Sequence, residues 1–153
     1  MLTLKRTTSS DVDFKSLVAL LDHDLAIRDG SEHAFFAQFN KIDTIQHVVV
    51  AYLDSLPVAC GAFKPYDKTT AEIKRMFVKP EHRKKGMAAA VLNELELWAA
   101  QENFTHCILE TGKRQPEAIS LYKKQGYALI PNYGQYIGVE NSVCMKKEDK
   151  SNI

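Results

Sequence analysis

Short segments of the chain either alternate apolar and polar residues, as Leu2–Arg6 does, or form short apolar runs bounded by turn residues, and both patterns are typical of β-strands. These patterns predict strands at Leu2–Arg6, Val48–Leu53, Pro57–Phe63, Ala71–Val78, His106–Glu110, Tyr127–Ile130 and Ser142–Met145. The links at Asp54-Ser55 and Pro65–Lys68 are too short for a crossover connection. The three strands that they join should therefore run antiparallel to one another.

Four other segments carry apolar residues at helical spacing. They are Phe14–Leu25, preceded by the N-cap candidates Ser9, Ser10 and Asp11 and ending near Asp29-Gly30; a short aromatic stretch, Ser31–Phe39; a long helix from about Met87 to Asn103; and a helix from Pro116 to Gly126. Because the long helix separates Ala71–Val78 from His106–Glu110, we expect these two strands to be parallel. The predicted fold class is α/β (an α+β mixed sheet), with a central, mostly antiparallel sheet of six to seven strands flanked by about four helices.

Composition narrows the function classes. The chain has 153 residues, with 20 Lys and Arg against 19 Asp and Glu. We expect one domain over 1–153 with a frayed tail at 147–153, and no overall field that would attract nucleic acid or an anionic membrane. No apolar run reaches membrane-spanning length, and the N-terminus lacks the apolar core of a signal peptide. Three cysteines, Cys60, Cys107 and Cys144, lie in apolar strand patterns without metal-ligand spacing. The interpretation is a cytoplasmic protein with no metal site.

A basic turn stands between the strand Ala71–Val78 and the long helix. Pro80 ends the strand, Gly86 precedes the helix, and six basic residues crowd the region: Lys74, Arg75, Lys79, Arg83, Lys84 and Lys85. A helix N-terminus has unpaired N–H groups and a partial positive charge, and glycine lets its backbone approach a phosphate closely. The turn lacks the Gly-Lys-Ser/Thr of kinase-type loops and the three glycines of the dinucleotide fingerprint. We therefore predict a different kind of phosphate cradle.

Two motifs around this turn resemble one family. The spacing Arg83-x-x-Gly86-x-Ala88 resembles motif A of the GNAT acyltransferase superfamily, and Leu121-Tyr122-x-x-x-Gly126-Tyr127 resembles its Leu-Tyr-x-x-x-Gly-Phe/Tyr segment. The resemblance covers Val48 to Lys146 and implies a GNAT-like sheet that binds acetyl-coenzyme A (acetyl-CoA). It assigns cofactor contacts to Met76, Phe77, Val78, Arg83, Lys84, Lys85, Gly86, Met87, Ala88, Gln115 and Tyr122. Gln115 departs from the family, which often has asparagine there.

The same resemblance suggests two catalytic residues. Tyr122 takes the place of the family's general acid; the alternative is a packed tyrosine with a satisfied hydroxyl. Glu72 lies fourteen positions before Gly86, where histone-acetylating members carry their catalytic glutamate. Glu72 could accept a proton through water or simply pair with Lys74 or Arg75. Glu110, at the end of the next strand, is a rival base.

The acceptor is left to a weaker resemblance. Residues 110–119 and 131–136 resemble a bacterial subgroup whose members are mostly unassigned or act on small amines and amino acids. The candidate substrate-binding residues are Arg28, Arg75, Glu110, Tyr133 and Tyr136. Our first hypothesis is an acetyl-CoA-dependent N-acetyltransferase for the amine of such a small molecule, acting as a monomer or homodimer without nucleic acid or membrane. The alternatives are a non-catalytic acyl-CoA-binding sensor and a peptide or protein lysine acetyltransferase.

Overall fold

A seven-stranded sheet in the order β1-β2-β3-β4-β5-β7-β6 organises the molecule. The structure is a computed structural model that describes residues 1–29 and 44–149. The strands are β1 (Leu2–Thr7), β2 (His47–Leu53), β3 (Leu56–Pro65), β4 (Thr70–Val78), β5 (His106–Gly112), β6 (Ala128–Ile130) and β7 (Ser142–Glu148). All neighbouring strands are antiparallel except β4 and β5, which are parallel. The sequence prediction of a mixed, mostly antiparallel sheet is confirmed.

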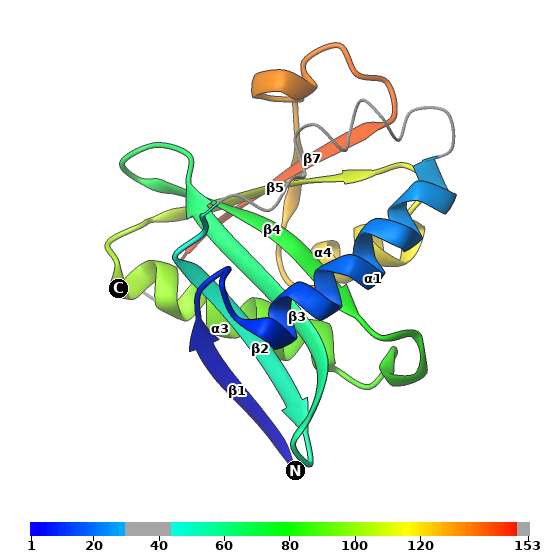
Figure 1. Cartoon of the computed structure of the whole chain (residues 1–153). Coiled ribbons are helices and arrows are strands. Elements are labelled where there is room, and N and C mark those ends of the chain that lie inside the picture. The colour runs from blue at the N-terminus through cyan, green and yellow to red at the C-terminus, as the bar shows by residue number, and fades with distance from the viewer. Residues whose placement is uncertain (30–43, 150–153) are drawn as a thin grey trace.

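Helices cover both faces of this sheet. The α-helices of the described ranges are α1 (Val12–Asp29), α3 (Met87–Gln101) and α4 (Pro116–Lys124). Figure 1 shows α1 in front of the sheet and α3 behind it. The fourth predicted helix, Ser31–Phe39, lies outside the described residues. Short 3₁₀ turns occur at Pro80–His82 and Gly134–Tyr136.

Two hydrophobic clusters fix these layers. The larger cluster packs α3 residues such as Val91, Leu92 and Leu95 against one face of the sheet. The smaller cluster packs α1 residues such as Phe14 and Leu17 against the other face. Burial of apolar side chains on both faces explains why the central strands read as nearly continuous apolar runs.

Local signals in the sequence account for several element ends. Asp11 caps α1, because its Oδ1 accepts the Phe14 N–H at 3.0 Å. Asp54 and Ser55 both have positive φ, 50° and 72°, as a two-residue hairpin turn requires. The predicted cap and hairpin are therefore present.

The predicted frayed tail begins too early. Lys147 and Glu148 belong to β7, where they pair with Cys107 and His106 of β5. The Asp149 N–H donates to the Thr105 carbonyl at 2.8 Å, and Asp149 itself is buried. The prediction of disorder from 147 onward is wrong for 147–149, because a charged edge segment can be held by backbone pairing on one side.

Candidate active site

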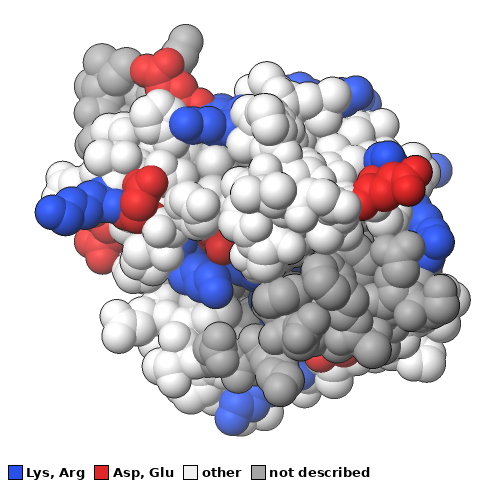
Figure 2. Space-filling model, turned by 90° about the horizontal axis from the view of Figure 1, so that it is seen from above, with Lys and Arg blue, Asp and Glu red and all other residues white. Residues whose placement is uncertain are grey.

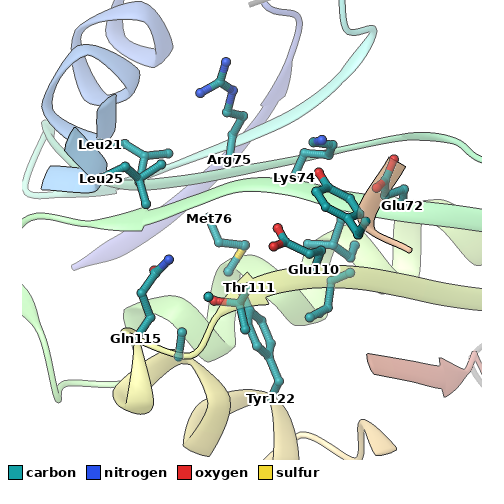
Figure 3. A pocket seen from close by; sticks show the side chains of 15 residues that line it. Leu21, Leu25, Glu72, Lys74, Arg75, Met76, Glu110, Thr111, Gln115 and Tyr122 are labelled. Atoms are coloured by element: carbon teal, nitrogen blue, oxygen red, sulfur yellow. The ribbon is translucent and has the colours of Figure 1, made fainter. Parts of the chain in front are cut away.

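A cavity opens where β4 and β5 separate. The two strands pair only between Thr70–Glu72 and His106–Ile108, although both continue beyond these positions. The cavity between their diverging parts has a volume of about 100 Å³. It is lined by Leu21, Leu25, Glu72, Ile73, Lys74, Arg75, Met76, Leu109, Glu110, Thr111, Gly112, Gln115, Ala118, Tyr122 and Tyr136 (Figure 3).

Side chains reach this cavity from both faces of the sheet. Ile73 and Leu109 belong to the cluster under α3, together with Tyr122 of α4. Because side chains alternate along a strand, their neighbours Glu72 and Glu110 point to the α1 face. Figure 3 shows the same arrangement, with Tyr122 on one side of the gap and the α1 leucines on the other. The candidate acid and the candidate bases therefore approach the gap from opposite faces.

A β-bulge in β4 shapes the middle of the cavity. Residues Cys60 and Ala62 of β3 pair with Phe77 and Lys74, so β4 carries one extra residue there. Arg75, within the bulge, has a φ of +61°. The bulge turns Arg75 toward α1, where its Nη1 donates to Asp22 at 2.9 Å. The alternative that Glu72 pairs with Arg75 is not what the structure shows.

The predicted phosphate turn forms the N-terminus of α3. Gly86 is the N-cap residue, with φ +83°, and no side chain caps the helix. A Cβ built at Gly86 would meet no atom within 4 Å, so the space outside it is open. The first turn contains no acidic residue, and Lys84 and Lys85 precede it. Free N–H groups, open approach and positive charge fit the pyrophosphate of a coenzyme A.

Arg83 is engaged within the protein at this turn. Its Nε donates to the Val78 carbonyl at 2.9 Å, its guanidinium lies 5.6 Å from the Phe77 ring centre, and its Nη2 lies 3.7 Å from Asp24 of α1. Phe77 itself is buried in the cluster under α1. Both residues were predicted to contact the cofactor, yet the structure shows their side chains supporting the turn and the core.

Tyr122 lines the cavity and keeps its hydroxyl protonated. It is buried on α4, and burial together with the nearby charge of Glu110 raises its pKa. The side chain therefore keeps its proton well above neutral pH, as a resident general acid must. Gln115, a predicted cofactor contact at the N-terminus of the same helix, lines the cavity.

Glu72 and Glu110 each accept a hydrogen bond from a hydroxyl. Tyr133 donates to Glu72 Oε2 at 2.7 Å, and Ser142 donates to Glu110 Oε2 at 2.8 Å. Burial and the charge of Glu72 raise the pKa of Tyr133, so this hydroxyl stays protonated as the donor. The Tyr133 ring also meets Tyr136 and Tyr66 edge-on, at 5.7 and 5.2 Å between ring centres.

Sequence reasoning found some of these residues and missed others. The cavity collects seven predicted site residues: Glu72, Arg75, Met76, Glu110, Gln115, Tyr122 and Tyr136. Leu21, Leu25 and Thr111 were not predicted, because a leucine on an apolar helix face carries no signal that distinguishes cavity from core. The Arg28 side chain lies outside the described part of the chain.

Several other features bear on function. In the described ranges, no group of three or more His, Cys, Asp or Glu side chains is placed to hold a metal ion. No described helix is long and apolar enough to span a membrane. On the face shown in Figure 2, basic and acidic side chains are interspersed and neither sign forms a continuous patch.

Comparisons with known proteins agree with this geometry. Residues 15–127 match the Acetyltransferase (GNAT) family. An IAA acetyltransferase from Azospirillum brasilense is 34% identical over 100 residues, which are 65% of this chain and 65% of that protein. The matched part of the chain thus spans less than two thirds of the length of this curated relative.

Solved structures share the fold over nearly the whole chain. A protein from Klebsiella pneumoniae, proposed to be an acyl-CoA N-acyltransferase, has a TM-score of 0.81 and 28% identity and covers 97% of both chains. A GNAT family acetyltransferase from Elizabethkingia anophelis with acetyl-CoA bound has a TM-score of 0.67 and 17% identity, covering 96% of this chain and 97% of that one. With the sheet, the split between β4 and β5 and the family match in agreement, the chain belongs to the GNAT acetyltransferase family.

Proposed function

We propose that the protein is an N-acetyltransferase that transfers an acetyl group from acetyl-CoA to the amine of a small molecule. The observation that carries the proposal is the cavity through the sheet, which brings Glu72 and Glu110 from one face and Tyr122 from the other to the same gap. Membership of the acetyltransferase family supports the reaction class.

The N-terminus of α3 would hold the cofactor. The N–H groups of the first helical turn, with Lys84 and Lys85 beside them, would bind its pyrophosphate, and Gly86 leaves room for it. Met76 and Gln115 line the gap that its arm would enter. Bound acetyl-CoA would supply the activated acetyl thioester. The residues of the chain orient the acceptor and manage its protons.

The two proton transfers of the reaction take place on opposite faces of the sheet. On the α1 face, Glu72 accepts the proton of the acceptor ammonium, directly or through water, while Tyr133 holds its Oε2 in place. Glu110 lines the same face and remains the rival base. On the opposite face, Tyr122 provides a proton from its hydroxyl to the leaving group. Because each group stays on its own face, the two transfers do not compete for one site.

A small acceptor fits the cavity better than a protein substrate. The volume is about 100 Å³, and the loop between β6 and β7 contributes Tyr136, which is 1% exposed, to its lining. Tyr133 of the same loop donates a hydrogen bond to the lining residue Glu72. Arg75, Glu110, Tyr133 and Tyr136 are the described candidates for acceptor contacts. We infer that these tyrosines cover the cavity and restrict it to small amines and amino acids.

Binding and turnover test the proposal separately. Saturating acetyl-CoA should raise the melting temperature, because a ligand that binds only the folded state stabilises it by mass action. Turnover is tested by the release of free thiol across a panel of amines and amino acids. The panel includes IAA, because the relative from Azospirillum brasilense is named an IAA acetyltransferase. Binding with no turnover on a wide panel would favour the acyl-CoA sensor, and an unmoved melting transition would contradict the cofactor assignment.

The Tyr122→Phe variant tests the assigned acid. It should lower turnover about tenfold or more, the usual scale for a positioned acid, while acetyl-CoA still raises the melting temperature. Tyr52→Phe is the matched control, since the Tyr52 hydroxyl donates to Asp13 and Tyr52 does not line the cavity. Equal turnover in both variants would show that Tyr122 is only a packed residue.

A further inference from the structure

Arg75 carries a buried hydrogen-bond donor without an acceptor. Its side chain is 3% exposed, and its one partner among the described side chains is Asp22, whose own side chain is 50% exposed. The buried Nη2 of Arg75 has no hydrogen-bond partner among the residues that the structure describes. A guanidinium has five N–H donors in a fixed fork, and burial without acceptors is unfavourable. This donor group therefore requires an explanation.

The backbone at Arg75 has an unusual conformation. Arg75 lies in the bulge of β4 with a φ of +61°, which residues other than glycine rarely adopt. Bulges of this kind redirect a side chain out of the regular alternation. Here the result is an arginine that lines the cavity beside Leu21 and Leu25, on the α1 face (Figure 3).

The same face of the cavity carries charges of both signs. Glu72 and Glu110 line it from β4 and β5, and Lys74 of β4 lines it as well. Lys74 interacts electrostatically with both glutamates. Arg75 is different, because the one acceptor that the described part of the chain gives its guanidinium is the half-exposed Asp22 of α1. The α1 face of the cavity thus has two carboxylates, Glu72 and Glu110, and also the incompletely paired guanidinium of Arg75.

We propose that the acceptor is an amine that also carries a carboxylate, and that Arg75 binds this carboxylate through Nη2. This inference rests on the proposed acetyltransferase function and narrows its substrate class. The ammonium of such an acceptor faces Glu72 and Glu110, whereas its carboxylate faces Arg75. Asp22 holds the guanidinium through Nη1 and leaves the other nitrogen for the substrate. Arginine suits this role because its planar fork matches a carboxylate.

Matched pairs of acceptors test the proposal on the unaltered enzyme. The pairs are alanine with ethylamine, leucine with 3-methylbutylamine, and phenylalanine with phenethylamine, each differing only in the carboxylate. We expect kcat/KM to favour the amino acid by about tenfold or more, the scale of a charge-assisted hydrogen bond. Equal kcat/KM within every pair that turns over would overturn the proposal.

Two variants locate the effect at Arg75. Arg75→Met keeps the unbranched stem, and the preference for the amino acid within each pair should fall about tenfold or more. Asp22→Asn removes the negative charge that partly neutralises the guanidinium, so KM for the amino acid should fall. A drop of the same factor for both members of a pair in Arg75→Met would mean that Arg75 is purely structural. If Arg75→Met does not fold, the wild-type pairs and Asp22→Asn still decide.

A binding measurement separates this inference from the proposed function. N-acetylleucine and N-acetyl-3-methylbutylamine differ only in the carboxylate, and their binding can be followed by calorimetry without acetyl-CoA. We expect the wild type to bind the carboxylate-bearing compound more tightly, and Arg75→Met to lose this difference. That result without turnover of any acceptor would leave the carboxylate site standing and remove the enzyme function. Equal binding of both compounds to the wild type would overturn the carboxylate site.

Discussion

Arg75 and Gly86 both have a left-handed φ, but for different physical reasons. At Gly86 the conformation begins α3, and glycine adopts it without a steric penalty. At Arg75 the same conformation strains a residue that has a side chain. In this conformation the bulge points the guanidinium toward α1, where it bonds Asp22. One position favours close approach of a ligand, and the other positions a charge.

Substitutions in the phosphate turn should separate ligand binding from support of the turn. Gly86→Val adds a β-branched side chain at φ +83° in the open space outside the helix N-terminus. We expect it to weaken acetyl-CoA binding sharply, because the added atoms occupy the path of the pyrophosphate. Arg83→Ala removes a hydrogen bond to Val78 and the contact with Phe77. It should lower the free energy of unfolding by about 1 kcal/mol and affect affinity less.

Calorimetric titration with acetyl-CoA and urea unfolding measure the two effects. Lys15→Ala, on the exposed face of α1, serves as the surface control. If Arg83→Ala abolished acetyl-CoA binding and Gly86→Val did not weaken it, the backbone of this turn would not be the phosphate site.

Residues of the site were predictable where a short motif specifies them. Gly86 and Tyr122 each belong to a motif of a few consecutive residues, so the sequence places them without knowledge of the fold. The bond from Tyr133 to Glu72 joins residues 61 positions apart and depends on the path of the loop between β6 and β7. The partner of Arg75 could not be predicted either, because Asp22 approaches only after α1 packs on the sheet.

At the scale of elements, the bulge in β4 depends on a glycine in β3. Gly61 lies opposite the extra residue, and the bulge brings Met76 across toward it. A Cβ at Gly61 would lie 2.5 Å from Met76 Sδ and 2.9 Å from both Leu95 and Val91. Strand β3 therefore makes room for the side chain that lines the cavity.

The Gly61→Ala variant should destabilise the protein by about 1–3 kcal/mol through overpacking. Met76 is flexible, but Val91 and Leu95 are fully buried in the cluster under α3 and cannot move aside freely. Urea unfolding measures the loss. A double variant, Gly61→Ala with Met76→Ala, should recover part of it, and no recovery would show that the Met76 contact is not the cause.

Element types were predictable from periodicity, but strand ends and irregularities were not. The apolar runs Val48–Leu53 and Ala71–Val78 identified β2 and β4 within one residue at each end. The bulge has no signature in Lys74-Arg75-Met76, since nothing in these residues favours a left-handed arginine. The end of β7 was missed because Lys146–Glu148 has the composition of a solvated tail. In the structure Lys147 bonds the buried Glu96 at 2.9 Å.

At the scale of the whole molecule, many neutral acids are buried. Burial raises the pKa of Cys60 and of Cys107 to about 12. It also raises the pKa values of Tyr122, Tyr127, Tyr133 and Tyr136. All of these groups lose their protons more readily in the unfolded chain than in the folded protein, so they link stability to pH.

Stability should therefore fall in alkaline solution. The contribution of these thiols is fully present below their unfolded pKa of about 8.5 and is lost as the pH rises toward about 12. Each group lowers the free energy of unfolding by about 1.4 kcal/mol per pH unit within its window. Tyrosines join above about pH 10. Burial lowers the pKa of Lys74, so this one group makes stability rise with pH and opposes the effect of the several thiols and tyrosines.

Urea unfolding at pH 7, 9 and 10, followed by the fluorescence of Trp98, the one tryptophan, measures this trend. Cys60→Ala should remove one group's share of the slope. A free energy of unfolding that does not change between pH 7 and pH 10 would contradict the linkage.

The separation of β4 from β5 gives the sheet two inner edges. Past Glu72 and Ile108 the facing backbones no longer pair with each other, as they would in an unbroken sheet. Unpaired strand edges exchange their amide hydrogens quickly and offer a template to any extended chain. Coenzyme A in the gap should slow hydrogen exchange in residues 73–78 more than in β2, and mass spectrometry of the two segments tests this. Aggregation of the ligand-free protein should fall in the same titration, so that the cofactor also acts as the cover of an otherwise open sheet.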